Sequence, residues 1–150
     1  MDFDTIKAGL SAAVPLVRTM HIEYLELSDE RALLRLPDDA AFHNHIGGLH
    51  AGAIFSLGES ASGAIVIAAF NEQLARSVPL AGEASITYKR VAMGPVLAEA
   101  RLGKAKADVV AELDSGENGR FPVEVTLTTE DGTVTAEMTV VWVLRLNRNA

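Results

Sequence analysis

Three polar side chains within a short stretch of the chain have types and spacing that could support chemistry. Asn44 lies in a glycine-rich loop, His50 follows it, and Glu59 comes nine residues after His50. Glu59 is the only ionisable residue between His50 and Asn71. A lone carboxylate among small and apolar residues is expected to have a raised pKa, which suits a general base. Glu59 is therefore the leading candidate for a catalytic group.

One long helix, predicted from about His50 to Phe70, would position this carboxylate. Apolar residues recur along one side at helical intervals, at Ile54, Leu57, Ala61, Ile65 and Ala68. Small residues and the carboxylate recur along a second side, at Gly52, Ser56, Glu59 and Gly63. Because neither side is strongly polar, we expect the helix to be largely buried.

The start of this helix is a candidate site for negative charge. The first N–H groups of a helix lack partners within it and lie at the positive end of the helix dipole. They can stabilise an anion or a carbonyl oxygen that gains negative charge. Gly52 would let a ligand approach this end closely, and Asn44 offers a neutral amide on the loop above.

The remaining segments are predicted mainly as strands. A short amphipathic helix is expected over residues 4–18 and another over 104–114, both peripheral. Strands are expected at 20–27, 31–36, 83–91, 95–103, 121–129 and 134–146, with turns at Ser28-Asp29-Glu30, Ala92-Met93-Gly94-Pro95 and Asp131-Gly132. About six antiparallel strands and one long helix give an α+β layer architecture in a single domain, residues 1–150. A sheet curled around the helix would bury both of its sides.

Composition and charge exclude several classes of protein. The chain has 150 residues, 13 Lys and Arg against 20 Asp and Glu, and no Cys, so its formal net charge is −7. The lack of Cys excludes disulfides, thiolate metal sites, iron–sulfur clusters and a cysteine nucleophile. The negative charge argues against nucleic acid as a partner. The N-terminus does not have the pattern of a signal peptide, and the longest nearly apolar stretch, 61–70, is half of the roughly 20 residues that span a membrane. We therefore expect a cytoplasmic protein without a membrane partner.

The segment from Asn44 to Glu59, NHIGGLHAGAIFSLGE, resembles the active-site segment of hot-dog-fold acyl-CoA thioesterases. The likeness is greatest to the phenylacetate-pathway and 4-hydroxybenzoyl-CoA thioesterase branch. The order of elements matches too, with two strands, a central helix and then the remaining strands. The segment Ile86-Thr-Tyr88, followed by basic residues and a Gly-Pro turn, extends the likeness. The resemblance covers nearly the whole chain and implies a hot-dog fold.

The resemblance also implies roles for individual residues. Glu59 matches the catalytic carboxylate, which acts as a nucleophile or as a general base on water. Ala51 matches the residue whose backbone N–H polarises the thioester carbonyl. Asn44 matches an amide that helps to hold the thioester or the attacking water, and His50 matches an orienting histidine. The candidate substrate-binding residues are Gly48, Gly52, Ser56, Lys89 and Arg90, of which the two cations would contact the phosphates of coenzyme A.

The resemblance also implies a substrate and an oligomeric state. The substrate would be an acyl-CoA or a related thioester, with no further cofactor and no metal. The protein would be a homodimer or a dimer of dimers, with active sites at the subunit interface. One departure stands out, because relatives carry a Ser or Thr that orients water where this chain has Ala81. Ser85 or Ser56 could take over that task.

Other interpretations of the same residues stay open. The chain could be a hot-dog dehydratase or hydratase of 3-hydroxyacyl thioesters, or a non-catalytic protein that binds acyl-CoA as a sensor. Asn44 could serve only as a turn former, and His43 and His45 are interpreted as loop residues. Lys89 and Arg90, with Lys104 and Lys106, could form a solvated charged edge of the sheet.

Overall fold

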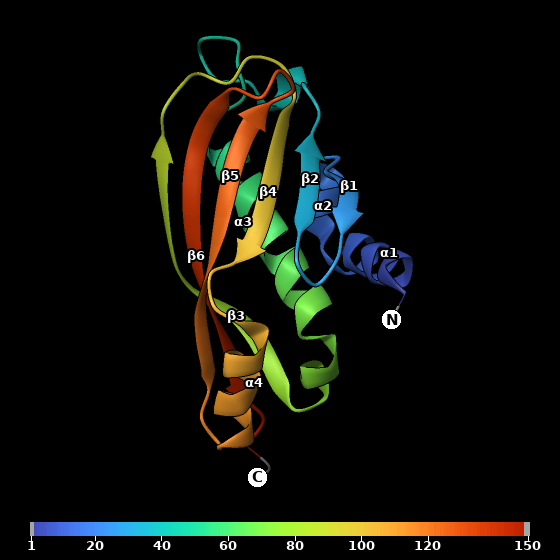
Figure 1. Cartoon of the computed structure of the whole chain (residues 1–150). Helices are drawn as coiled ribbons and strands as arrows, with labels where there is room; N and C mark the ends of the chain where they lie inside the picture. Colours follow the sequence, from blue (N-terminus) through green and yellow to red (C-terminus); the bar gives the residue numbers. More distant parts are fainter. Residues whose placement is uncertain (1, 149–150) are drawn as a thin grey trace.

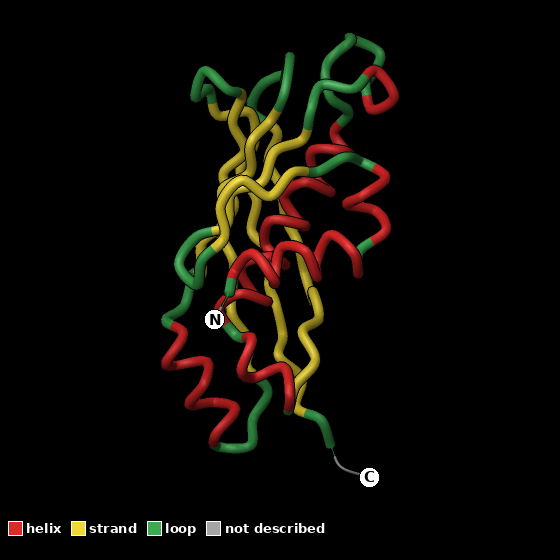
Figure 2. Tube along the Cα trace, turned by 90° about the vertical axis from the view of Figure 1, so that its right-hand side faces the viewer, coloured by secondary structure: helices red, strands yellow, loops and turns green. Residues whose placement is uncertain are grey.

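A long helix, α3 (Ala51–Ala69), lies against one face of a six-stranded antiparallel sheet in the computed structural model, which describes residues 2–148 (Figures 1 and 2). The strands are β1 (Glu23–Leu27), β2 (Ala32–Leu36), β3 (Ser77–Tyr88), β4 (Val96–Leu102), β5 (Gly119–Thr129) and β6 (Val134–Leu146). The shorter helices are α1 (Phe3–Ala13), α2 (Pro15–Thr19) and α4 (Lys106–Asp114), with 3-10 turns η1 (Ala40–Phe42) and η2 (Asn71–Ala75). The predicted α+β architecture is confirmed.

The strands are ordered β1-β2-β4-β5-β6-β3 across the sheet. Strands β1 and β2 form one hairpin and β5 and β6 another, as the turn residues predicted. Strand β3 pairs with β6 at the far edge of the sheet, so α3 carries the chain from β2 to the opposite edge. The strands β3 and β4 flank the turn at 92–95, but they lie apart in the sheet and do not pair with each other.

Alternation of apolar residues explains which face of each strand is buried. In β2 the residues Ala32, Leu34 and Leu36 are fully buried, and their neighbours in the strand are half-buried. The strand β6 repeats this pattern from Ala136 to Leu144. Side chains on alternate positions of a strand point to the same face, so these residues face α3 and form the core.

Helix α3 is largely buried, as expected, and the side with the small residues is the less covered one. Eleven of its 19 residues are buried, and they include the whole predicted apolar stripe. The side that carries Ser56, Glu59 and Gly63 is half-exposed. The buried side packs against β2, β4 and β5. Within residues 2–148 α3 is the one helix long and apolar enough to cross a membrane by length and composition, although more than half of its most apolar stretch is buried against the sheet.

Two polar or small residues fix how closely α3 approaches the sheet. A Cβ at Gly58 would lie 2.6 Å from the Met138 sulfur, so a larger residue there would displace the flexible Met138 side chain. Ser62 is fully buried, and its hydroxyl accepts a hydrogen bond of 2.9 Å from the indole Nε1 of Trp142. These contacts place the middle of the helix, and with it Glu59, at a defined height on the sheet.

Several predicted boundaries were wrong. The single helix expected over 4–18 is two helices, because Pro15 cannot continue α1 and instead begins α2. The third strand begins at Ser77, six residues before the predicted start at 83. Proline at position 79 is tolerated there because β3 lies at the sheet edge, and a register shift between Ala81 and Glu83 accommodates Gly82. The predicted short helix at 104–114 is confirmed as α4, which buries Val109 and Leu113.

Candidate active site

The loop that precedes α3 is held together by Asn44. Its side-chain Oδ1 accepts hydrogen bonds from the backbone N–H groups of Ile46 (2.9 Å) and Gly48 (3.1 Å). Its backbone N–H donates to the carbonyl of Gly48 at 2.8 Å. The interpretation of Asn44 as a turn former is confirmed. Asn44 also lines the cavity described below, so it can both form the turn and contact a ligand.

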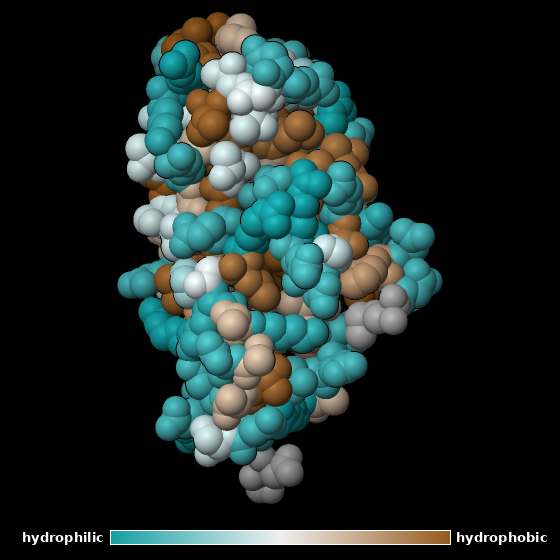
Figure 3. All heavy atoms as spheres, viewed as in Figure 1, coloured by the Kyte–Doolittle hydropathy of each residue, from teal (hydrophilic) through white to brown (hydrophobic). Residues whose placement is uncertain are grey.

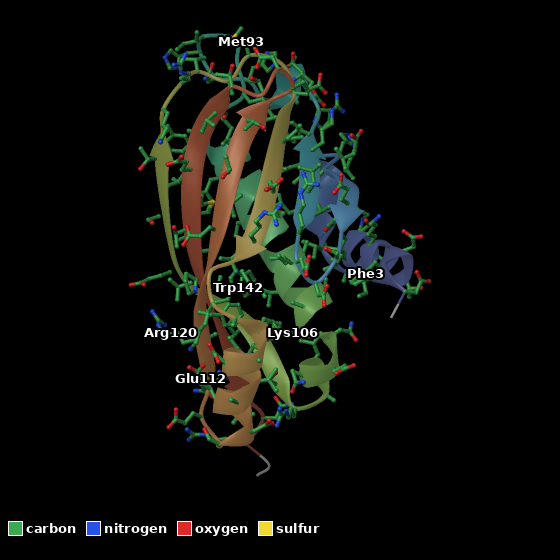
Figure 4. The ribbon with its side chains drawn as sticks, viewed as in Figure 1. Phe3, Met93, Lys106, Glu112, Arg120 and Trp142 are labelled. Carbon is green, nitrogen blue, oxygen red and sulfur yellow. The ribbon has the colours of Figure 1, made fainter. Side chains whose placement is uncertain are left out.

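Gly48 is required by packing. A Cβ at this position would lie 2.5 Å from the carbonyl oxygen of Ala92, closer than real Cβ atoms approach. The next residue, Leu49, donates its N–H to the same carbonyl at 3.0 Å. The loop 44–48 therefore rests directly on the segment 91–93, and the two together form one end of the molecule, where Figure 4 labels Met93. Three side chains exposed at this end are apolar, and brown atoms are visible there in Figure 3: Ile46, Val91 and Met93.

The first turn of α3 leaves one backbone donor free. His50 is the N-cap, and its Nδ1 accepts the N–H of Gly52 at 2.8 Å, so its ring proton lies on Nε2. The N–H groups of Ala53 and Ile54 donate to the His50 carbonyl. Within residues 2–148 the N–H of Ala51 has no acceptor, and the residue is exposed. The positive end of the helix thus presents a single unused donor, at Ala51.

Gly52 serves this cap. A Cβ at Gly52 would lie 3.1 Å from His50 Nδ1, so a larger residue would require the imidazole to shift by a few tenths of an ångström. The orienting histidine predicted at position 50 therefore has a defined structural task at the start of α3.

A cavity of about 330 Å³ opens at the start of α3, and Ala51 is one of the residues that line it. It brings together predicted site residues from three parts of the chain, namely the loop, the helix start and the end of β3. Its lining consists of Asn44, Leu49, Ala51, Ile54, Tyr88, Lys89, Arg90, Val91 and Ala92. The lining thus combines apolar side chains with two cations, Lys89 and Arg90, which suits a ligand with an uncharged arm and a negatively charged end.

The two predicted cations at the rim differ in how they are paired. Lys89 Nζ lies 2.8 Å from Glu137 Oε2. In the part of the chain that the structure describes, Arg90 forms no ion pair. Lys104 pairs with Glu112, and Lys106 Nζ lies 3.9 Å from Asp29 Oδ2. Arg90 is therefore the cation beside the cavity that is available for a phosphate.

Glu59 lies outside this cavity. It is eight residues along the helix from Ala51, a rise of about 12 Å at 1.5 Å per residue. Its side chain is half-buried, and burial raises the pKa of its carboxyl, as the sequence predicted. No group among residues 2–148 donates a hydrogen bond to this carboxylate. Within one protomer, Glu59 and the Ala51 N–H are too far apart to act on one carbonyl group.

Ser56 and Ser85 lie where they serve other contacts. The hydroxyl of Ser56 donates to the Gly52 carbonyl one turn earlier, at 2.9 Å. Ser85 pairs with Thr139, whose hydroxyl bonds to Glu124 on the face of the sheet away from α3. Ala81 pairs with Trp142 on the face toward α3. Ser85 thus faces away from the helix and cannot take over the water-orienting task expected near position 81.

Two tyrosines belong to this region that the sequence did not assign to the site. The Tyr88 hydroxyl donates a 3.0 Å hydrogen bond to the Ala51 carbonyl, which links the end of β3 to the start of α3. Burial and the charge of Glu59 raise the pKa of Tyr24 to about 12, which places this half-buried phenol near the carboxylate. The sequence marks Tyr88 only through the likeness of Ile86-Thr-Tyr88 to the family, and no signal marks Tyr24, because tyrosine is an ordinary strand residue.

The described residues contain no group of three or more His, Asp or Glu side chains arranged to hold a metal ion. His43 Nε2 lies 2.6 Å from Asp38 Oδ1, so this histidine forms a local pair within the loop before α3.

Comparison with known proteins identifies the family. A family model described as a domain of unknown function, DUF4442, matches residues 4–144. The chain belongs to the DUF4442 family. A search of curated proteins finds no match to this DUF4442 chain.

Solved structures similar to this DUF4442 chain establish its fold. A probable thioesterase of unknown function from Pseudomonas aeruginosa is 28% identical, with 98% of this chain and 97% of that one covered and a TM-score of 0.87. A thioesterase-family protein from Silicibacter pomeroyi is 20% identical, with 97% and 100% covered and a TM-score of 0.79. A mutant thioesterase from Pseudomonas aeruginosa is 20% identical, with 97% and 96% covered and a TM-score of 0.78. The predicted hot-dog fold is thereby confirmed.

Proposed function

We propose that this protein hydrolyses an acyl-CoA, or a related acyl thioester, in a site shared between two copies of the chain. The observation that carries the proposal is that the protomer has, among its described residues, two groups without a hydrogen-bond partner, and that the reaction needs both. The Ala51 N–H is a free donor at the cavity, and Glu59 is a half-buried carboxylate without a hydrogen-bond donor in the described residues. A second copy would bring Glu59 to the donor that it cannot reach in its own protomer.

Two surfaces of the protomer are suited to such an assembly. The side of α3 that carries Ser56, Glu59 and Gly63 is only half-covered. Strand β3 lies at the sheet edge, and of its twelve residues only Ser77, at its start, is buried. An uncovered edge strand of this length invites pairing with another strand. Pairing two copies along β3 would place helices and loops of both on one side of a continuous sheet.

The chemistry would proceed through the thioester carbonyl. The carbonyl oxygen accepts the Ala51 N–H, which stabilises the negative charge that develops on the oxygen. Glu59 either removes a proton from water, which then attacks the carbonyl carbon, or attacks that carbon itself to form an anhydride that water hydrolyses. In both routes the carbon–sulfur bond breaks, and the thiolate leaves and takes up a proton. Burial raises the pKa of Glu59, which makes it a stronger base than an exposed carboxylate.

Ligand recognition would follow the lining of the cavity. The pantetheine arm would contact the apolar residues beside Ile54 and Leu49, and Arg90 would contact a phosphate at the rim. These contacts fit coenzyme A or the phosphopantetheine of a carrier protein.

A complementation experiment tests the shared site. Ala51→Pro removes only the N–H, because the first helical position tolerates proline and His50 already has the extended conformation (φ −62°, ψ 141°) that a following proline requires. Glu59→Gln removes the carboxylate. Each variant alone should release almost no thiol from a panel of acyl-CoAs, whereas Glu117→Gln, an exposed carboxylate elsewhere, should match the wild type.

Mixing the two inactive variants gives the decisive result. Random pairing after unfolding and refolding together would make half of the dimers mixed, and each mixed dimer would hold one intact site, so about a quarter of wild-type activity should return. Failure of the mixture to recover activity would place the whole site in one protomer. Full activity in Glu59→Gln alone would exclude its catalytic role, binding without thiol release would favour a sensor, and dehydration of a 3-hydroxyacyl-CoA would favour a dehydratase.

A further inference from the structure

The Tyr88 hydroxyl makes the one side-chain hydrogen bond to the first residue of α3 among the described residues. It reaches Ala51 from a position 37 residues later in the chain, across 3.0 Å from Oη to the carbonyl oxygen. Both residues line the same cavity. The contact therefore lies within the candidate site, although its acceptor is a backbone group that the reaction does not use directly.

The start of α3 needs such a contact. Ala51 and Gly52 are exposed, and glycine is the most flexible residue in a helix. Helix ends fray unless caps or tertiary contacts hold them. Since the Ala51 N–H is the one free donor of this turn, any motion of Ala51 changes the direction in which that donor points.

The tyrosine is part of a continuous chain of hydrogen bonds. Tyr88 donates to the Ala51 carbonyl, and the N–H of the same peptide group, on Gly52, donates to His50 Nδ1. Hydrogen bonds linked through one peptide group polarise and strengthen one another. These two hydrogen bonds thus hold the peptide group between residues 51 and 52 from both sides.

The segment that carries Tyr88, at the other end of this series of hydrogen bonds, is rigid. The backbone N–H groups of Lys89 and Arg90 donate to the Thr135 carbonyl at 2.8 and 3.2 Å. Thr135 is buried, and its hydroxyl donates to the Leu127 carbonyl. The ring of Tyr88 therefore projects from a segment tied to the core of the sheet.

We propose that Tyr88 is a positioning residue, whose hydroxyl holds the first turn of α3 so that the Ala51 N–H stays directed at the substrate carbonyl. This inference rests on the proposed function for its catalytic consequence. It also makes a structural statement about the helix start that can be measured without substrate.

The kinetic test compares Tyr88→Phe with Thr87→Val. Tyr88→Phe keeps the ring and removes only the hydroxyl. The control removes a hydroxyl from the preceding residue, Thr87, whose side chain points to the opposite face of the sheet. Tyr88→Phe should lower kcat about tenfold, the rate equivalent of one hydrogen bond, and leave KM within about twofold. Thr87→Val should leave both constants near the wild-type values. An equal change in kcat and KM accompanied by a lower melting temperature would show a general structural role and overturn the proposal.

Amide hydrogen exchange at residues 51–55 provides the second test. Loss of the Tyr88 hydroxyl should speed exchange in this segment at least about threefold, with exchange elsewhere in α3 unchanged. Unchanged exchange in Tyr88→Phe would overturn the proposal whether or not the protein cleaves thioesters. If Glu59→Gln abolishes thiol release but Tyr88→Phe keeps full kcat, the proposed function stands and the positioning role of Tyr88 is refuted.

Discussion

Replacing Ser62 with alanine tests whether the buried bond between α3 and the sheet holds the helix in place. The Trp142 indole donates to the Ser62 hydroxyl at 2.9 Å, and Ser62 is inaccessible to solvent while Trp142 is 8% exposed. In Ser62→Ala the buried N–H loses its acceptor, which costs about 1–3 kcal/mol. The higher helix propensity of alanine returns about 0.5 kcal/mol. The expected net loss is about 0.5–2.5 kcal/mol, a fall in melting temperature of about 1–10 °C for a domain of this size.

The matched control is Ser60→Ala, two residues earlier on the same helix. The Ser60 hydroxyl donates to the Ser56 carbonyl and is only half-buried, so its loss strands no buried partner. This variant should be as stable as the wild type or slightly more stable. Thermal and urea unfolding at one protein concentration would measure both, with Trp142, the only tryptophan, as a fluorescent probe. Equal stability of the two variants would refute the claim that the Ser62 bond fixes the helix.

Four further predictions concern Glu59, the loop before α3 and helix α1. Because burial raises the pKa of Glu59, the hydrolysis rate should increase with pH through a value above the ordinary 4.5 of a glutamate and then level off. Because burial raises the pKa of Glu59, the neutral carboxyl is favoured in the folded protein. This contribution to stability is complete at pH values below the pKa of Glu59 in the unfolded chain, and it is lost as the pH rises through the pKa in the folded protein. Glu59→Gln should therefore have a higher melting temperature than the wild type near pH 7 and the same melting temperature near pH 4. Gly48→Ala, whose Cβ would meet the Ala92 carbonyl at 2.5 Å, should lose about 1–3 kcal/mol in urea unfolding; unchanged stability would show that the loop yields freely. Gly9→Ala, in α1 with nothing within 4 Å of the added Cβ, should gain about 0.5–1 kcal/mol by the same measurement, and a loss would contradict the open space seen there.

Elements with one clear period could be predicted from the sequence. The spacing of apolar residues placed α3 within one residue at each end, and the alternation in 134–146 gave both ends of β6. Strand β3 was only partly predicted, because Pro79 and Gly82 look like breakers when the strand is not known to lie at an edge. Pairing of β3 with β6 instead of β4 depends on contacts between distant segments, which local pattern does not encode.

The candidate site was predictable in its chemistry and less so in its geometry. The carboxylate and the helix start follow from residue types and from the likeness of the segment 44–59 to a known family. The separation between Ala51 and Glu59 follows only once the helix is built, because it is a rise along an axis. The hydrogen bond from Tyr88 to the start of α3 could not be predicted, because its acceptor is a backbone carbonyl, which every residue type has.

The position of α3 in the chain has a consequence during protein synthesis. Of the three strands that cover its apolar side, only β2 precedes it, whereas β4 and β5 are made later. A ribosome that has released residues up to about 90 therefore presents a 19-residue apolar helix with two of its three covering strands missing. Until β4 and β5 emerge, that helix has the length and composition that chaperones and membranes bind, so chains ending before residue 119 should accumulate as aggregates or in complex with a chaperone.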